Sequence, residues 1–419
     1  MRRRYLGAGV VLAVAVALAG VMAQGYQRAT TSGPGGVLVD QNPAAVVVDA
    51  ATRHVFVVNA GLCIRPVSMR DSCGSVSMLD TGRGTALRTI TVGDHPQDIA
   101  LDAPLHRAVV VSGNTPTNGS VSLLDTVTGR VVRTLRLGGS PSFVVVDSRT
   151  HHAFITSSFA NTVTMLDTRS GRVLHRAVVG QIPARIGVDP ATGRVFVGNE
   201  QSNTVSVLDA RSGRVIRTVA VGLTPAMIAT DTRTARVFVM NAGNQSLTVL
   251  NAVDGAPLGV VALPGIPTAA AVDTGRGLLF VTTATQPIGL RGNGHVCALD
   301  ARTGAVLRTT AVGQNPEGVA VDTRTGRMVV TATGPWDMRR QEYPDKGVVQ
   351  VLDARTGALL QTHVVDVGPW FVAVDEQLGH AFVINTRGTG PQSAPTEWWL
   401  AWAPYRFPRG TVSMLDIAH

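Results

Sequence analysis

Three charged side chains occupy positions where the sequence otherwise places mostly small or apolar residues. Asp98 and Arg185 each follow a proline by two residues, and Glu317 follows a proline by one. Most equivalent positions in the chain hold Phe, Met, Ala or Ser. Carboxylates and a guanidinium in such a setting can bind a polar ligand or exchange protons. We therefore expect a polar pocket formed by these three residues, with paired or solvent-exposed charges as the alternative.

Aromatic residues gather in the C-terminal part of the chain. The five tryptophans lie between residues 336 and 402, with Tyr405 close behind. Each aromatic side chain buries about 150–250 Å² when it is covered. They could therefore pack into a cap or form a surface for a ligand or partner, and both interpretations stay open. The candidate binding residues of this group are Trp336, Trp370, Trp398, Trp399, Trp402 and Tyr405.

Common catalytic and metal-binding motifs are absent from the sequence. No pair of histidines has metal-ligand spacing with a third partner, so we predict no zinc or copper site. No Gly-rich phosphate loop, nucleophile elbow or kinase motif occurs. We predict no catalytic residue and no cofactor. Five histidines fall in predicted turns and are expected to be solvent-exposed: His54, His106, His151, His152 and His380.

The three cysteines indicate one disulfide. Cys63 and Cys73 lie in the same loop, and a disulfide between them is plausible in an oxidising compartment. Cys297 lies in a predicted strand and is expected to be a buried apolar side chain. Neither Cys-x-x-Cys nor Cys-x-x-Cys-His occurs, so neither a redox pair nor covalent haem attachment is indicated.

A repeated unit must position these residues. Residues 183–224 contain four short β-branched runs separated by Asp-x-x-x-Gly turns, which together predict a four-stranded antiparallel meander. Eight copies follow one another with a period of 42 to 53 residues. Eight copies at such a period predict a closed β-propeller of eight four-stranded blades. The proline that starts each unit is Pro43, Pro96, Pro141, Pro183, Pro225, Pro267, Pro316 or Pro369.

The two ends of the repeat region complement each other. The eighth unit stops at Asp416, before a fourth strand. Val37 to Val39 precede Pro43 at the offset of a fourth strand, so we predict that this N-terminal strand closes the ring. Residues 37–416 then form a single propeller domain.

Unit length varies only between the second and third strands. These connections are longest in units six, seven, eight, one and two, which are neighbours in a closed ring. They emerge on the same face as the connections between successive units. We call this the looped face and expect the long loops to crowd one sector of it.

The N-terminus resembles an export signal. Arg2, Arg3 and Arg4 precede an uncharged apolar run, and a small-residue cleavage site ends at Ala23. We predict a signal peptide at 1–23, or a retained membrane anchor, followed by a flexible lead-in at 24–36. The protein is thus expected to be periplasmic, secreted or at the cell surface, and to contact a membrane only if this segment is uncleaved.

The net charge of +9 comes almost entirely from arginines. These arginines recur at turns and in fourth strands, where a solvated rim is expected. A nucleic-acid-binding protein would instead concentrate them on one face with stacking aromatic residues, so we predict no nucleic-acid partner.

The second strands carry the sequences FVVN at Phe56, FVGN at Phe196, FVMN at Phe238 and FVIN at Phe382. Together with the VSVLD strand at Val205, they make the repeat region resemble the YVTN/YncE-type β-propeller repeat proteins. The resemblance implies a secreted or periplasmic propeller, and it implies no single chemistry. It also implies seven blades as the alternative to eight, because members of that family often have seven. In this chain Ser, Thr or Ala replaces the strand-end Asn in several copies.

We therefore expect a binding or scaffold protein that presents the aromatic-rich looped face to a small-molecule ligand or protein partner. The alternative is an enzyme or enzyme subunit, either a propeller lactone hydrolase or a component of a quinone- or haem-dependent redox complex. A third possibility is a structural protein of the cell envelope.

Overall fold

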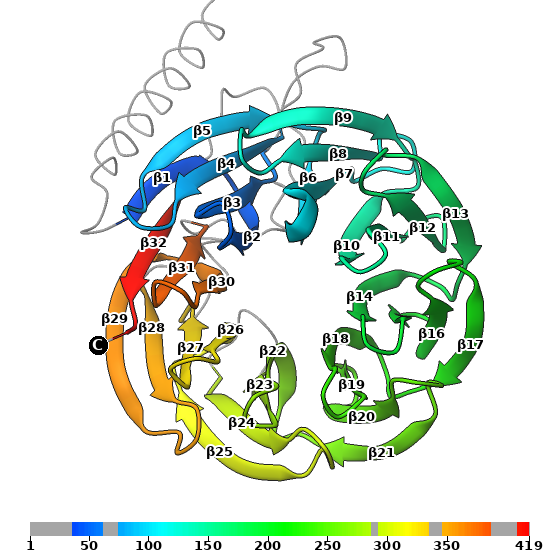
Figure 1. The fold of residues 1–419 in the computed structure, drawn as a ribbon. Coiled ribbons are helices and arrows are strands. Elements are labelled where there is room, and N and C mark those ends of the chain that lie inside the picture. Colours follow the sequence, from blue (N-terminus) through cyan, green and yellow to red (C-terminus); the bar gives the residue numbers. More distant parts are fainter. Residues whose placement is uncertain (1–35, 62–73, 286–291, 335–345, 387–408, 419) are drawn as a thin grey trace, which may run out of the picture.

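Eight four-stranded antiparallel sheets surround a common axis in the computed structural model, which describes residues 36–61, 74–285, 292–334, 346–386 and 409–418. Figure 1 shows the sheets as the blades of a ring, with the first strand of each blade innermost. The prediction of eight blades is confirmed, and the alternative of seven is wrong.

The innermost strand of each blade begins at or next to a proline and ends at an Asp. These strands are β2 (Pro43–Asp49), β6 (Pro96–Asp102), β10 (Pro141–Asp147), β14 (Pro183–Asp189), β18 (Pro225–Asp231), β22 (Ile266–Asp273), β26 (Pro316–Asp322) and β30 (Pro369–Asp375). The second strands are β3 (His54–Asn59), β7 (Arg107–Ser112), β11 (His152–Ser157), β15 (Arg194–Asn199), β19 (Arg236–Asn241), β23 (Leu278–Ala284), β27 (Arg327–Ala332) and β31 (His380–Asn385).

The third and fourth strands complete each blade toward the outside of the ring. The third strands are β4 (Ser75–Asp80), β8 (Ser120–Asp125), β12 (Thr162–Asp167), β16 (Thr204–Asp209), β20 (Ser246–Asn251), β24 (Gly294–Asp300), β28 (Lys346–Asp353) and β32 (Arg409–Asp416). The outermost strands are β5 (Ala86–Thr91), β9 (Arg130–Arg136), β13 (Val173–Val178), β17 (Val215–Ala220), β21 (Pro257–Ala262), β25 (Val306–Val312), β29 (Leu359–Val367) and β1 (Gly36–Gln41).

The N-terminal strand closes the ring, as predicted. β1 pairs antiparallel with β32, so the last blade has the order β1-β32-β31-β30. In this pairing Val37 lies opposite Val412, and Leu38 lies opposite Thr411. The edge of β32 is therefore covered by the other end of the chain.

The turns opposite the looped face follow the predicted chemistry, and we call this side the turn face. In the turn after β16, the Asp209 carboxylate accepts hydrogen bonds from the backbone N–H groups of Arg211 and Ser212. Gly213 then adopts a left-handed conformation with φ of 71°, which glycine tolerates without steric cost. In blade two, the connection between β6 and β7 contains the single 3-10 helix of the described residues, η1 (Ala103–Leu105), in place of an Asp-x-x-x-Gly turn.

The core lies between neighbouring blades. Six phenylalanines of the second strands are completely buried, and Phe154, for example, packs with Val195 and Leu208 of the next blade. Near the axis the strands leave little space, because a Cβ atom at Gly187 would lie 2.8 Å from Ile228 of the next blade. Small residues at this position therefore allow the innermost strands to converge.

Candidate functional site

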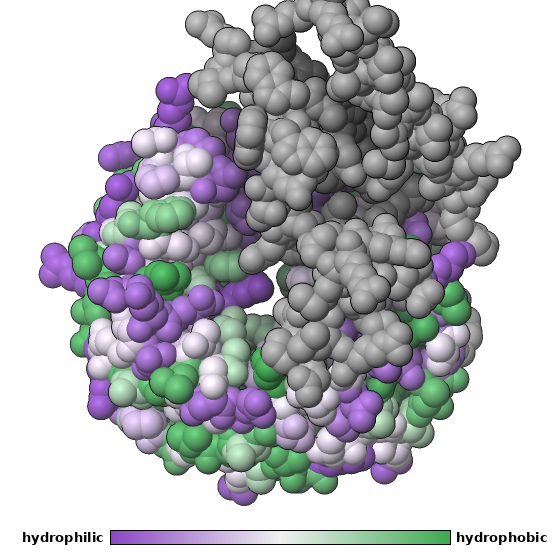
Figure 2. All heavy atoms as spheres, turned by 180° about the vertical axis from the view of Figure 1, so that it is seen from behind, coloured by the Kyte–Doolittle hydropathy of each residue, from purple (hydrophilic) through white to green (hydrophobic). Residues whose placement is uncertain are grey.

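The candidate site lies where the innermost strands begin on the looped face. Asp98 of β6, Phe143 of β10 and Arg185 of β14 occupy the same position in three consecutive blades. The pairing of each innermost strand with its neighbour is irregular just after the proline. Such bulges redirect side chains, here at the mouth of the ring. Figure 2 shows an opening near the ring axis.

Arg185 is the central residue of this group. Its guanidinium carbon lies 4.1 Å from the centroid of the Phe143 ring, the geometry of a cation–π contact. The side chain is half-buried, and among the described residues its guanidinium has neither a hydrogen bond nor an ion-pair partner. The aromatic ring therefore supports one side of the group and leaves its N–H donors unused.

Two carboxyl groups flank this guanidinium without a direct ion pair. Burial raises the pKa of Asp98 to about 6, although a hydrogen bond from the Val144 amide and the charge of Arg185 oppose this shift. Burial also raises the pKa of Glu200, against the lowering effect of Arg185. The pKa of Arg185 is lowered by burial, while Asp98 and Glu200 act to raise it.

The chemistry available here is recognition of an anionic group next to a titratable acid. A guanidinium with free N–H groups can donate two parallel hydrogen bonds to one carboxylate or phosphate. Because the Asp98 pKa lies near 6, this residue changes charge within a physiological range of pH. An anionic group bound to Arg185 would then be repelled by ionised Asp98, and this repulsion would depend on pH.

Glu317 lies in a different part of the ring, on blade seven. It is 4% exposed, and its Oε1 atom is buried without a hydrogen-bond partner among the described residues. Burial raises its pKa to about 8, with no contribution from Asp98 or Arg185. The structure thus brings Asp98 and Arg185 within electrostatic range of each other, but Glu317 forms a separate polar position.

Trp370 lies on β30, in the blade that follows Glu317. Its ring meets Phe371 edge-on at 6.2 Å, and both rings pack against the buried cluster that contains Val39. Its carbonyl oxygen accepts a hydrogen bond from the hydroxyl of Thr331 on blade seven. A Cβ atom at Gly318 would lie 2.6 Å from the same oxygen, so glycine is needed for this close approach.

The remaining predicted aromatic residues and the predicted disulfide lie outside the described residues. They remain predictions, as do the proposed signal peptide at 1–23 and the lead-in that follows it. The residues concerned are Trp336, Trp398, Trp399, Trp402, Tyr405, Cys63 and Cys73. Cys297, by contrast, is buried with a free thiol, as expected.

The prediction that the turn histidines are solvent-exposed is wrong for four of the five. Only His106 is exposed. The Nδ1 atom of His151 lies 2.9 Å from the buried Asp102 carboxylate of the preceding blade, which also accepts a hydrogen bond from Thr168. The Nδ1–H groups of the other three donate hydrogen bonds across a blade boundary to backbone carbonyl groups: His54 to Thr126, His152 to Ala210 and His380 to Thr81.

Two residues of the Arg185 environment were not predicted from the sequence. Phe143 has the apolar character usual at its position, so nothing distinguished it. Glu200 did leave a signal, because it is the only charged residue at its position in the repeat, 17 residues after the proline that starts each unit. The seven equivalent residues are Ala60, Gly113, Ser158, Ala242, Ala284, Thr333 and Thr386.

Neither a metal cluster nor a membrane-spanning helix is found in the described part of the chain. No three His, Cys, Asp or Glu side chains of these residues gather as they would around a metal ion. No helix among them is long and apolar enough to span a bilayer.

Comparison with known proteins identifies a β-propeller family. The family model described as outer membrane protein assembly factor BamB matches residues 117–331. A search of curated proteins gave no match. Among solved structures, the chain is similar to dihydro-heme d1 dehydrogenase NirN in complex with DHE, at 12% identity and a TM-score of 0.59. This match covers 78% of the chain and 66% of the dehydrogenase, just under two thirds of its length.

A second solved structure with the same fold is Kuenenia stuttgartiensis hydrazine synthase. The identity is 12% and the TM-score is 0.53, with 93% of this chain and 98% of the synthase chain covered. At such low identity, both similarities concern the fold alone.

Proposed function

Because the chain belongs to the β-propeller family described as outer membrane protein assembly factor BamB, we propose that it is an extracytoplasmic binding or scaffold module. The resemblance to YVTN/YncE-type repeat proteins supports the same proposal at a finer level. A signal peptide or anchor at 1–23 would provide the export.

The ligand of this module is a molecule with a carboxylate or similar anionic group. The observation that carries the proposal is the Arg185 guanidinium, which lies over the Phe143 ring and donates no hydrogen bond to any described residue. A bidentate carboxylate would satisfy two of these donors. Asp98 would tune the affinity, because its ionisation places a second negative charge beside the bound group.

Aromatic side chains would extend the binding surface around the mouth. Trp370 is half-buried on the innermost strand of blade eight, and Trp336, Trp398, Trp399, Trp402 and Tyr405 belong to the long connections of blades seven and eight. Large aromatic residues supply much of the affinity in ligand and protein interfaces. Glu317 would contact a donor group of the ligand in this sector.

Calorimetric titration with succinate, citrate and an acidic tripeptide tests the proposal. The Arg185→Ala variant should lose about tenfold or more in affinity, because a charged hydrogen bond is worth roughly 1.5–3 kcal/mol. Binding to the wild type should weaken as the pH rises through about 6, where Asp98 ionises. The Asp98→Asn variant should lack this pH dependence.

The Glu317→Ala variant tests the separate polar position of blade seven. The Arg217→Ala variant is the control for Arg185→Ala. Arg217 lies on the outermost strand β17 and is exposed, so its loss removes an equal charge far from the axis. Unchanged carboxylate affinity in the Arg185→Ala variant, with the fold intact, would reject the axial site.

The alternative function is that of an enzyme or enzyme subunit. Asp98 favours it, because a buried carboxyl group with a pKa of about 6 beside an arginine can serve in acid–base chemistry. Absorbance of the purified protein in the visible range would support a redox component, and bound metal would support a hydrolase. A colourless, metal-free protein that binds carboxylates unchanged would support the binding module instead.

A further inference from the structure

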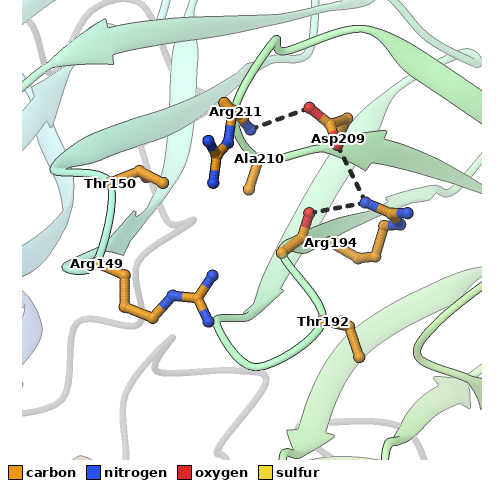
Figure 3. A pocket seen from close by; sticks show the side chains of 8 residues that line it. Arg149, Thr150, Thr192, Arg194, Asp209, Ala210 and Arg211 are labelled. Carbon is orange, nitrogen blue, oxygen red and sulfur yellow. Dashed lines mark hydrogen bonds and ion pairs between the residues drawn. The ribbon is translucent and has the colours of Figure 1, made fainter.

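A second polar pocket lies on the turn face, between blades three and four. It has a volume of about 190 Å³, and its lining comes from the turn after β10, the turn after β14 and the turn after β16. Three arginines dominate it: Arg149, Arg194 and Arg211. Figure 3 shows the guanidinium groups of Arg149 and Arg211 directed toward the same space from two neighbouring blades.

Arg149 differs from its counterparts in the other blades. Arg233 and Arg324 occupy the same turn position in blades five and seven. Each donates a hydrogen bond from Nε to a turn carbonyl of the next blade, at 2.7 and 2.8 Å. Within the described residues, the Arg149 guanidinium has no such partner, and it is exposed at the pocket.

The only carboxylate that lines the pocket is already fully engaged. Asp209 accepts hydrogen bonds from the backbone N–H groups of Arg211 and Ser212 and from the Ser212 hydroxyl. Its second oxygen lies 3.0 Å from the Arg194 Nη1 atom. Arg149 and Arg211 therefore face the same space without an ion-pair partner among the described carboxylates.

Arg194 is the fixed member of the three. Its Nε atom donates to the carbonyl group of Val253 in blade five, at 3.0 Å. Together with the Asp209 ion pair, this bond holds the side chain in one orientation. Its charge is thus neutralised within the protein, and among the described residues the guanidiniums of Arg149 and Arg211 are the ones left to bind an anion in the pocket.

We propose that this pocket is an oxyanion site that binds a phosphate group. Guanidinium groups that approach from different turns suit the several oxygens of a tetrahedral anion, whereas one guanidinium suffices for a planar carboxylate. A dianion would also relieve the repulsion between Arg149 and Arg211. The site is on the face opposite Asp98 and Arg185, so it goes beyond the proposed axial ligand and does not depend on it.

Titration with inorganic phosphate at constant ionic strength, with chloride as the comparison ion, tests the site. The wild-type protein should bind phosphate saturably, and chloride should not compete at equal concentration. The double variant Arg149→Gln/Arg211→Gln should bind at least about tenfold more weakly, since each charged hydrogen bond contributes roughly tenfold.

The double variant Arg302→Gln/Arg355→Gln is the matched control. Both residues are exposed in the equivalent turns of blades six and seven, so this variant loses the same charge without touching the pocket. Its phosphate affinity should stay within about twofold of the wild type, since a distant surface charge is largely screened. Equal weakening in the two double variants would overturn the proposal, because binding would then reflect net charge alone.

Vesicle flotation distinguishes a soluble phosphate from a lipid headgroup. Vesicles of phosphatidylcholine with and without phosphatidic acid serve as the probes. Phosphatidic-acid-dependent binding that disappears in the Arg149→Gln/Arg211→Gln variant assigns the site to a headgroup. Phosphate binding without vesicle binding assigns it to a soluble phosphate, and binding of neither probe overturns the site.

Discussion

Glu317 is a buried carboxyl group whose Oε1 atom has no hydrogen-bond partner in the part of the chain that the structure describes. Burial raises its pKa to about 8. An acid whose pKa is raised in the folded state destabilises the fold when it ionises. The destabilisation caused by ionised Glu317 is therefore absent at pH 4. It begins as the pH rises above the pKa of glutamate in the unfolded state, about 4.3, and it is complete above pH 8.

The Glu317→Gln substitution should remove this pH-dependent cost. At pH 5 the variant should be more stable by only about 1 kcal/mol, because Glu317 is neutral in the folded state and only the unfolded state has begun to ionise. At pH 8.5 the variant should be more stable by on the order of 4 kcal/mol, as each pKa unit corresponds to about 1.4 kcal/mol.

Thermal unfolding of both proteins from pH 5 to 8.5 measures this difference. Asp254→Asn, which neutralises an exposed turn carboxylate, is the control and should show no such trend. If Glu317→Gln gave a constant difference at every pH, Glu317 would not titrate in this range.

Among the structural elements, the turn after β10 in blade three contains a histidine–carboxylate contact that the other described turns lack. His151 occupies a left-handed position, with φ of 58°, that is glycine in four of the eight units. Its ring pairs with Asp102 at 2.9 Å, and Asp102 is completely buried at the end of β6. The η1 turn of blade two gives Asp102 no side-chain capping bond, so His151 and Thr168 satisfy it instead.

Replacement of His151 by glycine should therefore destabilise the ring even though it relieves backbone strain. Loss of a hydrogen bond to a buried carboxylate costs about 1.5–3 kcal/mol, more than the roughly 1 kcal/mol gained at a left-handed position. His106→Gly is the matched control, since His106 has φ of 49° at the same turn position but an exposed ring.

Denaturant unfolding of the two variants gives the comparison. His106→Gly should be neutral or slightly stabilising, and His151→Gly should lower the midpoint clearly. Equal midpoints for the two variants would mean that the Asp102–His151 pair does not hold blades two and three together.

The histidines show where prediction from the sequence reaches its limit. The period of the prolines and the alternation of β-branched residues predicted every blade, because these patterns depend on local geometry. The partners of His54, His152 and His380 lie on the next blade, tens or hundreds of residues away in sequence. A single copy of the repeat contains no information on such contacts.

The same limit applies to the candidate site. Asp98 and Arg185 stood out because charge interrupts an apolar position, and the structure places them within electrostatic range. Phe143 was overlooked because an aromatic ring at that position is unremarkable in sequence. Its role as the support for Arg185 appears only when blades three and four lie side by side.

At the scale of the whole molecule, the ring depends on one short strand from the far end of the chain. β1 covers the edge of β32, and Val39 is 4% exposed in a cluster that includes Val55 and Phe382. Burial of a valine side chain contributes about 1.5–3 kcal/mol, and the strand pairing adds to it. Without β1, the last blade would have three strands and an open edge next to blade one.

Deletion of residues 1–41 should therefore prevent cooperative folding, whereas deletion of residues 1–35 should not. The shorter deletion keeps β1 and should unfold at the temperature of the full chain. The longer deletion exposes the unpaired N–H and C=O groups of β32, which favour association with other chains.

Calorimetry and light scattering of both truncated proteins measure these outcomes. A synthetic peptide of residues 36–42 should restore a cooperative transition to the longer deletion, because it can occupy the vacant edge of β32 without the covalent link. A protein without residues 1–41 that stayed monomeric and unfolded like the full chain would show that seven complete blades hold the ring by themselves. In that case the pairing of β1 with β32 would not be required for the ring to fold.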